Sequence, residues 1–285
     1  MRKVYATVFI LVLITIILAI GPYLPHPKRW PALINKQTVT YMKTQKLDKI
    51  SVIIPTYNDG AQMLSATVNN VQAAAARPDL LEIIVVDGGS QDNSIDAIKQ
   101  IKQIKIATSQ GGRGPAINTG IKLASGKIIL MLHSDCLFEK NFDMLIRAAF
   151  ADPSVIMTAF EFDANSAIYP SLKSVERRVS ARSKYLWLPY GDQALAIRHR
   201  DLQNYFGGQI PNYKMMEDFE FVLQVRNFAL DHNKAIAILP QKVFSSPRRF
   251  LAKGPAYTAM LNWFFVTAYV WGGATPNAIF AWYYS

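Results

Sequence analysis

The sequence contains very little cysteine and histidine. Its one cysteine, Cys136, cannot form a disulfide within the chain, so nothing points to an oxidising compartment. The four histidines and this cysteine form no cluster with the spacing of zinc ligands. A disulfide scaffold and a structural zinc site are therefore excluded.

A glycine-rich phosphate loop is also missing after the first predicted strand. A dinucleotide-binding fold needs G-x-G-x-x-G at that point, because the backbone must approach the pyrophosphate. The turn reads PTYNDG over residues 55–60, and the glycines of residues 111–114 come too late. The sequence thus argues against a nicotinamide cofactor. It also disfavours a nucleotidyltransferase, whose phosphate loop should follow the first strand directly.

Acidic residues are fewer than basic ones. There are 31 lysines and arginines against 20 aspartates and glutamates, for a net charge of +11. Such a balance suggests nucleic acid, anionic lipid or a phosphorylated ligand. Part of the surplus lies on one face of a predicted amphipathic helix, at Lys173, Arg177, Arg178, Arg182 and Lys184. That face is either solvated, in contact with anionic lipid, or close to an anionic acceptor.

Charged residues are absent from an apolar stretch near the start of the chain. Residues 4–20 are just long enough, at ~1.5 Å per residue, to span the hydrocarbon core of a bilayer. A cleaved signal peptide is the alternative, because residues 19–21 have a small-x-small pattern. Pro22 follows directly, however, so we expect an uncleaved anchor over residues 1–22 and a linker over 23–48.

The end of the chain is a second uncharged region. Residues 254–285 contain no charged side chain and many aromatic ones, which favour the headgroup layer of a membrane. We expect the tail, residues 251–285, to lie on or dip into a membrane surface. A second membrane span and a helix that covers the folded domain are the alternatives.

Strands and helices alternate between these two ends. Strands are predicted at residues 50–54, 83–86, 104–107, 128–132 and 155–162, with helices between most of them, including one over residues 90–104. The helix that carries the basic face should bury Ile168, Leu172, Val175 and Val179. This alternation favours an α/β fold with a mainly parallel sheet and helices on both faces, over residues 49–250.

Three of the predicted strands end in polar side chains. Asp59, Asp87 and Asp135 follow three apolar strands, and open α/β sheets bind ligands at the carboxyl ends of their strands. A divalent cation bound with a diphosphate needs few protein carboxylates. One aspartate can hold a ribose or base, and a distant one can take a proton from an acceptor hydroxyl.

Residues 50–250 resemble the family 2 glycosyltransferases of the GT-A (Rossmann-like) fold, and more closely the small membrane-associated bacterial-type members. The resemblance implies a donor-binding turn made of Pro55, Thr56, Tyr57, Asn58 and Asp59; the family usually has Glu in place of Asp59. In VVDGGSQD, residues 85–92, Asp87 would hold the base or ribose. In GRGPAINTG, residues 112–120, Arg113 would lie near the donor.

The metal motif departs from the family pattern. The family usually has Asp-x-Asp, whereas this chain has His133, Ser134 and Asp135. By the resemblance, Asp135 is the metal ligand, for Mg²⁺ or Mn²⁺. His133 would have a structural or ribose-binding role, with metal ligation as the alternative.

Three later motifs also match the resemblance. Asp218 would be the general base in the family's Glu-Asp motif, beside Glu217; the alternative is an acidic pair at a helix N-terminus. Acceptor-side or diphosphate-binding roles are implied for Tyr190, Asp192, Gln193, Arg248 and Arg249. An ordinary turn at residues 190–193 and a juxtamembrane basic pair at 248–249 are the alternatives.

The resemblance implies an inverting, metal-dependent glycosyltransferase that moves a sugar from a UDP- or GDP-sugar to a hydroxyl acceptor. Membrane lipid is an expected partner, a lipid-linked acceptor is possible, and nucleic acid is not expected. The catalytic domain should be cytoplasmic, behind a single N-terminal anchor. A catalytically inactive membrane protein that binds nucleotide-sugar or lipid remains the alternative.

Overall fold

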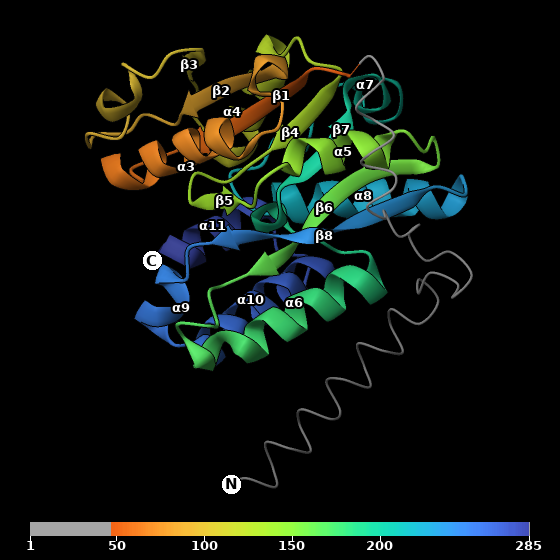
Figure 1. The fold of residues 1–285 in the computed structure, drawn as a ribbon. Helices are drawn as coiled ribbons and strands as arrows, with labels where there is room; N and C mark the ends of the chain where they lie inside the picture. Colours follow the sequence, from red (N-terminus) through yellow and green to blue (C-terminus); the bar gives the residue numbers. More distant parts are fainter. Residues whose placement is uncertain (1–46, 285) are drawn as a thin grey trace, which may run out of the picture.

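The computed structural model describes residues 47–284 (Figure 1). The predicted anchor and nearly all of the predicted linker lie outside these residues. Among residues 47–284, no helix has both the length and the apolar character needed to cross a membrane.

A single sheet of eight strands forms the centre of the described chain, in the order β3-β2-β1-β4-β7-β6-β8-β5. The strands are β1 (Ile50–Thr56), β2 (Leu81–Asp87), β3 (Ile104–Thr108), β4 (Ile128–Met131), β5 (Cys136–Phe138), β6 (Val155–Asp163), β7 (Leu195–Arg198) and β8 (Ala235–Ser245). All five predicted strands are confirmed.

The sheet is mixed, whereas a mainly parallel one was expected. β1 pairs in parallel with β2 and β4, β2 with β3, and β6 with β8. β7 runs antiparallel to both β4 and β6, and β5 antiparallel to β8. Because β7 runs opposite to β4, the turn that precedes β7 lies at the edge of the sheet where β1 and β4 end. The reversal therefore adds one more loop to the ligand-binding edge.

Helices cover both faces of the sheet, as predicted. On one face, α3 (Ala61–Ala74) and α5 (Phe142–Phe150) pack in one apolar core with β1, β2 and β4. On the other face, α4 (Arg113–Leu123) and α8 (Glu217–Asp231) pack in a second core. The short α7 (His199–Phe206) follows β7. The two faces are buried because the strand side chains alternate between the two cores.

The predicted helix over residues 90–104 is wrong. Only a single 3-10 turn, Asp96–Ile98, forms there, although Ile98 is buried as expected. Asp92 and Ser94 instead accept hydrogen bonds from the backbone N–H of Gly60, at 2.9 and 3.0 Å. Side chains that bond to a neighbouring loop in this way compete with helix formation.

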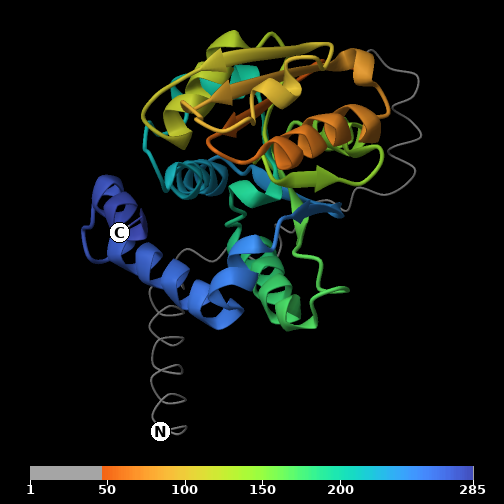
Figure 2. The ribbon, with the colours of Figure 1, turned by 90° about the vertical axis from the view of Figure 1, so that its left-hand side faces the viewer.

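A second group of helices lies at one end of the molecule (Figure 2). It comprises α6 (Lys173–Leu186), α9 (Arg248–Lys253), α10 (Pro255–Val270) and α11 (Pro276–Tyr284). Leu172, Val175 and Val179 are buried, as predicted. The prediction for Ile168 is wrong, because α6 begins only at Lys173 and leaves Ile168 66% exposed.

Candidate active site

The turns that follow β1 and β2 are joined by hydrogen bonds. The backbone N–H of Asn58 donates to Ser90 Oγ at 2.9 Å, and Asn58 Oδ1 accepts from the backbone N–H of Gln91 at 2.8 Å. Asn58 has a φ of 52°, a left-handed conformation that asparagine tolerates better than most residues. Asp87 is buried at the end of β2, while Tyr57 is largely exposed. The turn thus presents the Tyr57 ring at the surface beside Asp87.

Asp59 lies at the centre of a polar cluster at the end of β1. Its Oδ2 accepts hydrogen bonds from Thr56 Oγ1 at 3.0 Å and from Ser134 Oγ at 2.6 Å. Its Oδ1 accepts one from Arg248 Nη2 at 2.9 Å. The same guanidinium nitrogen is 3.8 Å from Asp135 Oδ2. Arg248 therefore links the predicted donor turn to the predicted metal ligand.

Asp218, the predicted base, is held at the N-terminus of α8. Its Oδ2 accepts a hydrogen bond from the backbone N–H of Gly191 at 2.8 Å, and its Oδ1 one from the N–H of Phe219 at 2.8 Å. Arg113 Nη2 is 3.6 Å from Oδ1. Burial alone would favour the protonated form, but Arg113 and these amides lower the pKa of Asp218. The carboxylate is therefore ionised and able to accept a proton.

Glu217 and Arg113 form a buried ion pair behind Asp218. Arg113 Nε donates to Glu217 Oε1, while Glu217 Oε2 has no hydrogen-bond partner. Burial raises the pKa of Glu217 to about 7, against the opposing effect of Arg113. Glu217 is fully buried and also lines the pocket described below.

His133 packs against the turn that holds Asp218. A Cβ atom at position 191 would lie 2.5 Å from His133 Nε2 and 2.9 Å from Asp218 Oδ2, so only glycine fits there. Burial, with Arg113 and Arg249 nearby, lowers the pKa of His133 to about 3. A neutral imidazole can donate or accept one hydrogen bond, which is compatible with contact to a sugar hydroxyl.

The turn formed by residues 190–193 is braced from α6. The Arg182 guanidinium lies 3.4 Å from the centre of the Tyr190 ring, and Arg182 Nη2 donates to Gln193 Oε1 at 3.2 Å. Gln193 Nε2 donates to the carbonyl of Phe160 at 2.8 Å. Arg182 thus points inward, and its predicted place on the outer basic face is wrong. Tyr190 and Gln193 both serve to hold the turn in place.

Asp192 is a buried carboxylate in the same turn. Its Oδ1 has no hydrogen-bond partner in the structure. Burial, together with Asp218 and Asp135, raises its pKa to about 6 despite the nearby Arg182. A buried, unsatisfied acceptor of this kind is costly in a folded protein unless a ligand satisfies it.

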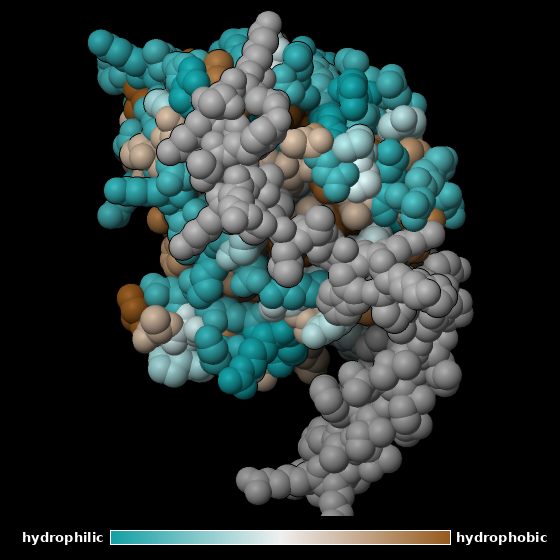
Figure 3. Space-filling view, turned by 45° about the vertical axis from the view of Figure 1, so that its right-hand side comes forward, coloured by the Kyte–Doolittle hydropathy of each residue, from teal (hydrophilic) through white to brown (hydrophobic). Residues whose placement is uncertain are grey.

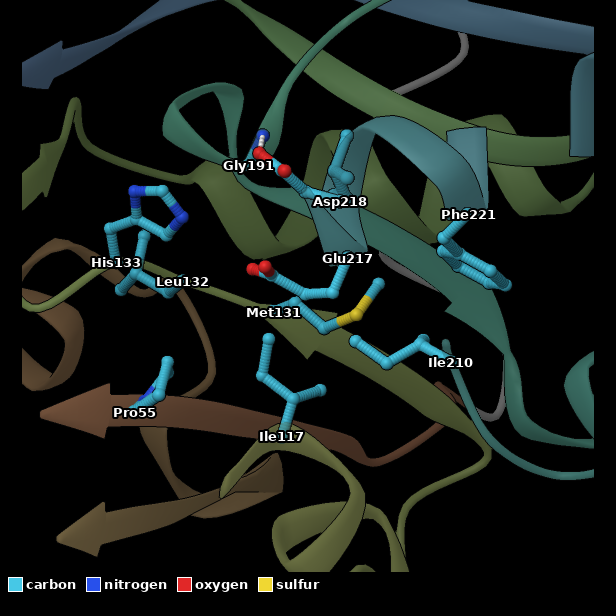
Figure 4. A pocket seen from close by; sticks show the side chains of 11 residues that line it. Pro55, Ile117, Met131, Leu132, His133, Gly191, Ile210, Glu217, Asp218 and Phe221 are labelled. Atoms are coloured by element: carbon cyan, nitrogen blue, oxygen red, sulfur yellow. Dashed lines mark hydrogen bonds between the residues drawn. The ribbon is translucent and has the colours of Figure 1, made fainter. Parts of the chain in front are cut away.

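A small pocket lies between these groups (Figure 4). Asp218, Gly191 and His133 line one side, and Glu217 and apolar side chains form the rest. Its lining residues are Pro55, Ile117, Met131, Leu132, His133, Gly191, Leu195, Ile210, Glu217, Asp218 and Phe221. Of the remaining predicted residues, Arg249 lies outside this pocket, with its guanidinium 5.1 Å from the centre of the Tyr283 ring. α11 therefore approaches the basic pair.

Sequence reasoning missed the roles of Ser134, Arg182 and Gly191. Ser134 lies inside the metal motif, and its bond to Asp59 could have been suspected from that position. Gly191 was noticed only as part of a turn. Arg182 had no sequence signal beyond its charge, because its inward direction depends on the packing of α6.

The carboxylates fit a divalent cation that takes most of its ligands from a diphosphate. Among residues 47–284, no group of three His, Cys, Asp or Glu side chains could hold a metal by itself. The Asp135 side chain is 19% exposed at the edge of the site, and Arg248 contacts both this carboxylate and that of Asp59. Burial raises the pKa of Asp135, although Arg248 opposes this. Mg²⁺ is usually bound through one or two carboxylates and substrate phosphates, so Asp135 is a suitable ligand.

Curated proteins that match this chain over about a third of its length are sugar transferases. The glycosyltransferase AglE of Haloferax volcanii is 36% identical over 99 residues, which is 33% of this chain and 32% of AglE. An undecaprenyl-phosphate 4-deoxy-4-formamido-L-arabinose transferase of Proteus mirabilis is 28% identical over 98 residues, which is 32% of this chain and 30% of that protein. The chain thus matches about a third of the length of these curated relatives.

The fold has known structural neighbours. The mannosyltransferase PcManGT from Pyrobaculum calidifontis, solved with GDP-Man and Mn²⁺, superposes with a TM-score of 0.52 and 19% identity. The superposition covers 74% of this chain and 63% of PcManGT. The likeness supports the predicted GT-A fold. Residues 51–206, more than half of the chain, match the sequence profile of glycosyl transferase family 2. The chain therefore belongs to glycosyl transferase family 2.

Proposed function

We propose that this protein is an inverting glycosyltransferase that moves a sugar from a nucleotide diphosphate to a hydroxyl acceptor. The position of Asp218 is the observation that carries the proposal. Its ionised carboxylate is fixed by the N–H groups of Gly191 and Phe219 and lines the pocket beside His133. A general base needs this combination of a fixed position and an ionised state.

The proposed reaction is a single displacement. Asp218 accepts the proton of the acceptor hydroxyl as the acceptor oxygen forms a bond to the anomeric carbon of the donor. The bond from that carbon to the diphosphate oxygen breaks on the opposite face, and the nucleoside diphosphate leaves. An α-linked donor therefore gives a β-linked product.

Three kinds of group are proposed to bind the donor: a carboxylate, two arginines and a metal ion. Asp87, buried at the end of β2, is placed to accept hydrogen bonds from a base or ribose. Arg248 and Arg249 are exposed cations that can meet diphosphate oxygens, in the bidentate manner that arginine permits. A bound Mg²⁺ or Mn²⁺, held by Asp135, would offset charge on the leaving diphosphate. The PcManGT complex with GDP-Man and Mn²⁺ supports a donor and a metal of these classes.

On the acceptor side, we propose contacts from the turn formed by residues 190–193. Asp192 Oδ1, buried without a partner, can accept a hydrogen bond from a hydroxyl of the donor sugar or the acceptor. A lipid-linked acceptor agrees with the name of the Proteus mirabilis relative. We also propose that the apolar run of residues 4–20 anchors the chain, with the folded domain on the cytoplasmic side.

Nucleotide binding and product stereochemistry test this function. Calorimetric titration of the full chain with UDP and GDP, with and without Mn²⁺, should show one preferred base and tighter binding with the metal. NMR of the product from an α-linked donor should show a β-linkage. Failure to bind either nucleotide would contradict the proposal, and an α-linked product would contradict the inverting mechanism.

A further inference from the structure

The outer face of α10 is apolar from end to end and exposed. Its exposed side chains recur at the spacing of one helix face. They include Tyr257, Met260, Trp263, Phe264 and Val270, and the exposed Trp271 follows directly after the helix. Trp271 is 66% exposed and Met260 59%. Trp282 of α11 extends this face, with its ring centre 6.2 Å from that of Phe264. Exposed apolar surface on this scale marks an interaction site.

The opposite face of α10 is fixed to the folded domain. Phe265 of α10 and Ile279 of α11 are buried in a small core with Met216 and Phe219, which flank Glu217 and Asp218. Tyr269 Oη donates a hydrogen bond to Glu220 Oε2 at 2.8 Å. The exposed face therefore belongs to a helix that packs on the segment carrying the proposed base.

Basic side chains lie beside this apolar face. Arg249 and Lys253 of α9 precede α10 and are exposed, while Arg248 of the same helix pairs with Asp59 and Asp135. Phe250 of α9 packs against a small core that includes Val175 and Val179 of α6. The views in Figures 1 and 2 agree that α6, α9 and α10 lie together at one end of the molecule.

The outer side of α6 adds further positive charge. Lys173, Arg177 and Arg178 are exposed there. The buried Glu176 accepts hydrogen bonds from the backbone N–H groups of Ala164 and Ser166, and it also lies 3.5 Å from Lys173 Nζ. Figure 3 shows hydrophilic side chains gathered at the lower end of the molecule, where α6 lies. No acidic residue occurs in α9 or α10. The end of the molecule thus combines exposed tryptophans with an excess of exposed lysines and arginines.

We propose that the α6, α9 and α10 surface docks on an anionic membrane. Tryptophan and tyrosine prefer the headgroup layer, where the apolar part of the ring is buried and the polar atom stays hydrated. Lysine and arginine near the surface are attracted to anionic lipid. A protein partner or a second copy of the chain would need acidic side chains to complement α6 and α9. An anionic leaflet instead presents negatively charged headgroups over its whole surface. The docked face carries the exposed side of α10 into the headgroup layer, while the opposite side stays packed against Met216 and Phe219.

A depth measurement with the full chain tests this surface. An environment-sensitive fluorophore is attached to single cysteines introduced by M260C and W271C, in protein reconstituted with phosphatidylcholine vesicles containing about one third phosphatidylglycerol. The matched control is I106C on β3, an exposed apolar position that lies at the other end of the molecule. The native Cys136 is buried, so labelling falls on the introduced thiol.

Lipids brominated near the headgroup should quench the probes at 260 and 271 at least about threefold more than the probe at 106. Equal quenching at all three positions would overturn the proposal. So would probes at 260 and 271 that are already shielded before vesicles are added, because the face would then be covered by a second copy or by another part of the chain.

Charge reversal tests the ionic part separately. K173E/R177E/R178E should weaken the binding of the α6, α9 and α10 surface to anionic vesicles by about 10²-fold, because each cation contributes roughly one kcal/mol. The matched variant K102E/K122E/K140E, which changes exposed lysines elsewhere, should leave the quenching unchanged. Equal effects of the two variants would contradict a role for α6. None of these readouts depends on enzyme turnover, so they are independent of the proposed function.

Discussion

The guanidinium of Arg248 lies 3.8 Å from the carboxylate of Asp135, the proposed metal ligand. It also donates to Asp59 at 2.9 Å. The Arg248 guanidinium thus bridges the two carboxylates. We propose that the donor diphosphate gives Arg248 an alternative partner, so that its guanidinium moves from the carboxylates to phosphate when the donor binds.

The first prediction concerns this arginine. R248A should raise the KM for the donor about tenfold or more, because a charge-assisted contact to the diphosphate is lost. R248K should recover part of the loss, since it keeps the charge but not the planar fork. Steady-state kinetics measure both variants.

Loss of an arginine away from the site, in α7, is the control for loss of positive charge. Arg200 is an exposed arginine that pairs with Asp201, away from the site, and R200A should leave the KM unchanged. An unchanged donor KM in R248A would contradict the proposed role of Arg248.

The second prediction separates the base from the nucleotide contact. D218N should lower kcat by about 10³-fold, because the amide cannot take the acceptor proton, while nucleotide binding stays intact. D87A should instead weaken nucleotide binding itself. Calorimetry on both variants measures this split, and the reverse pattern would refute the two assignments.

The third prediction tests the close fit at Gly191. G191A would place a Cβ atom 2.9 Å from Asp218 Oδ2, so the turn must move away from the base. We expect a loss in kcat of about 10²-fold, because a small displacement of a catalytic group has effects of this size.

G207A is the matched control for that variant. Gly207 has a φ of 67° at the end of α7 and no heavy atom near an added Cβ. G207A should therefore lower thermal stability without lowering kcat. Equal losses of activity in G191A and G207A would show that the effect at 191 is not specific to the site.

The fourth prediction concerns stability in acid. Burial alone would raise the pKa of Glu82, but Lys105, Ser51 and Ser125 outweigh it and lower the pKa from 4.5 to about 2. A lowered pKa in the folded state stabilises the protein above the unfolded value of 4.5, and this stabilisation is lost as the pH falls toward 2.

E82Q should therefore reduce the free energy of unfolding by roughly 2 kcal/mol at neutral pH, with a smaller deficit near the folded pKa. Urea unfolding at two pH values measures this. E139Q, at an exposed position, is the control and should have little effect. A deficit in E82Q that does not change with pH would refute the assignment.

Much of the fold could be predicted from the sequence because the strands are short apolar runs that end in polar turns. β1, β2 and β4 and their terminal aspartates were predicted in this way. The mixed sheet was not, because the direction of β7 depends on its pairing with β4 and β6. The absence of a helix over residues 90–104 was also missed, since Asp92 and Ser94 bond to Gly60, which is distant in the sequence.

The sequence predicted which residues form the site, but it did not predict which side chains contact one another, because these contacts depend on the packing of helices against the sheet. Motif spacing pointed to Asp135 and Asp218. The bond from Gly191 to Asp218 and the brace from Arg182 to Tyr190 required the packing of α6 and α8 against the sheet. The pairing of Arg113 with Glu217 likewise joins two motifs that the sequence presents separately.

The release of nucleoside diphosphate from a panel of UDP- and GDP-sugars tests the central claim most directly. With Mn²⁺ or Mg²⁺, the full chain should release UDP or GDP from one class of donor, and a suitable hydroxyl acceptor should accelerate the release. EDTA should abolish the activity, and D135A should abolish it while circular dichroism shows an intact fold. Turnover that persists in D135A, or in EDTA, would contradict the role of Asp135 as metal ligand. Failure to bind or turn over any sugar nucleotide would contradict the proposed function as a whole.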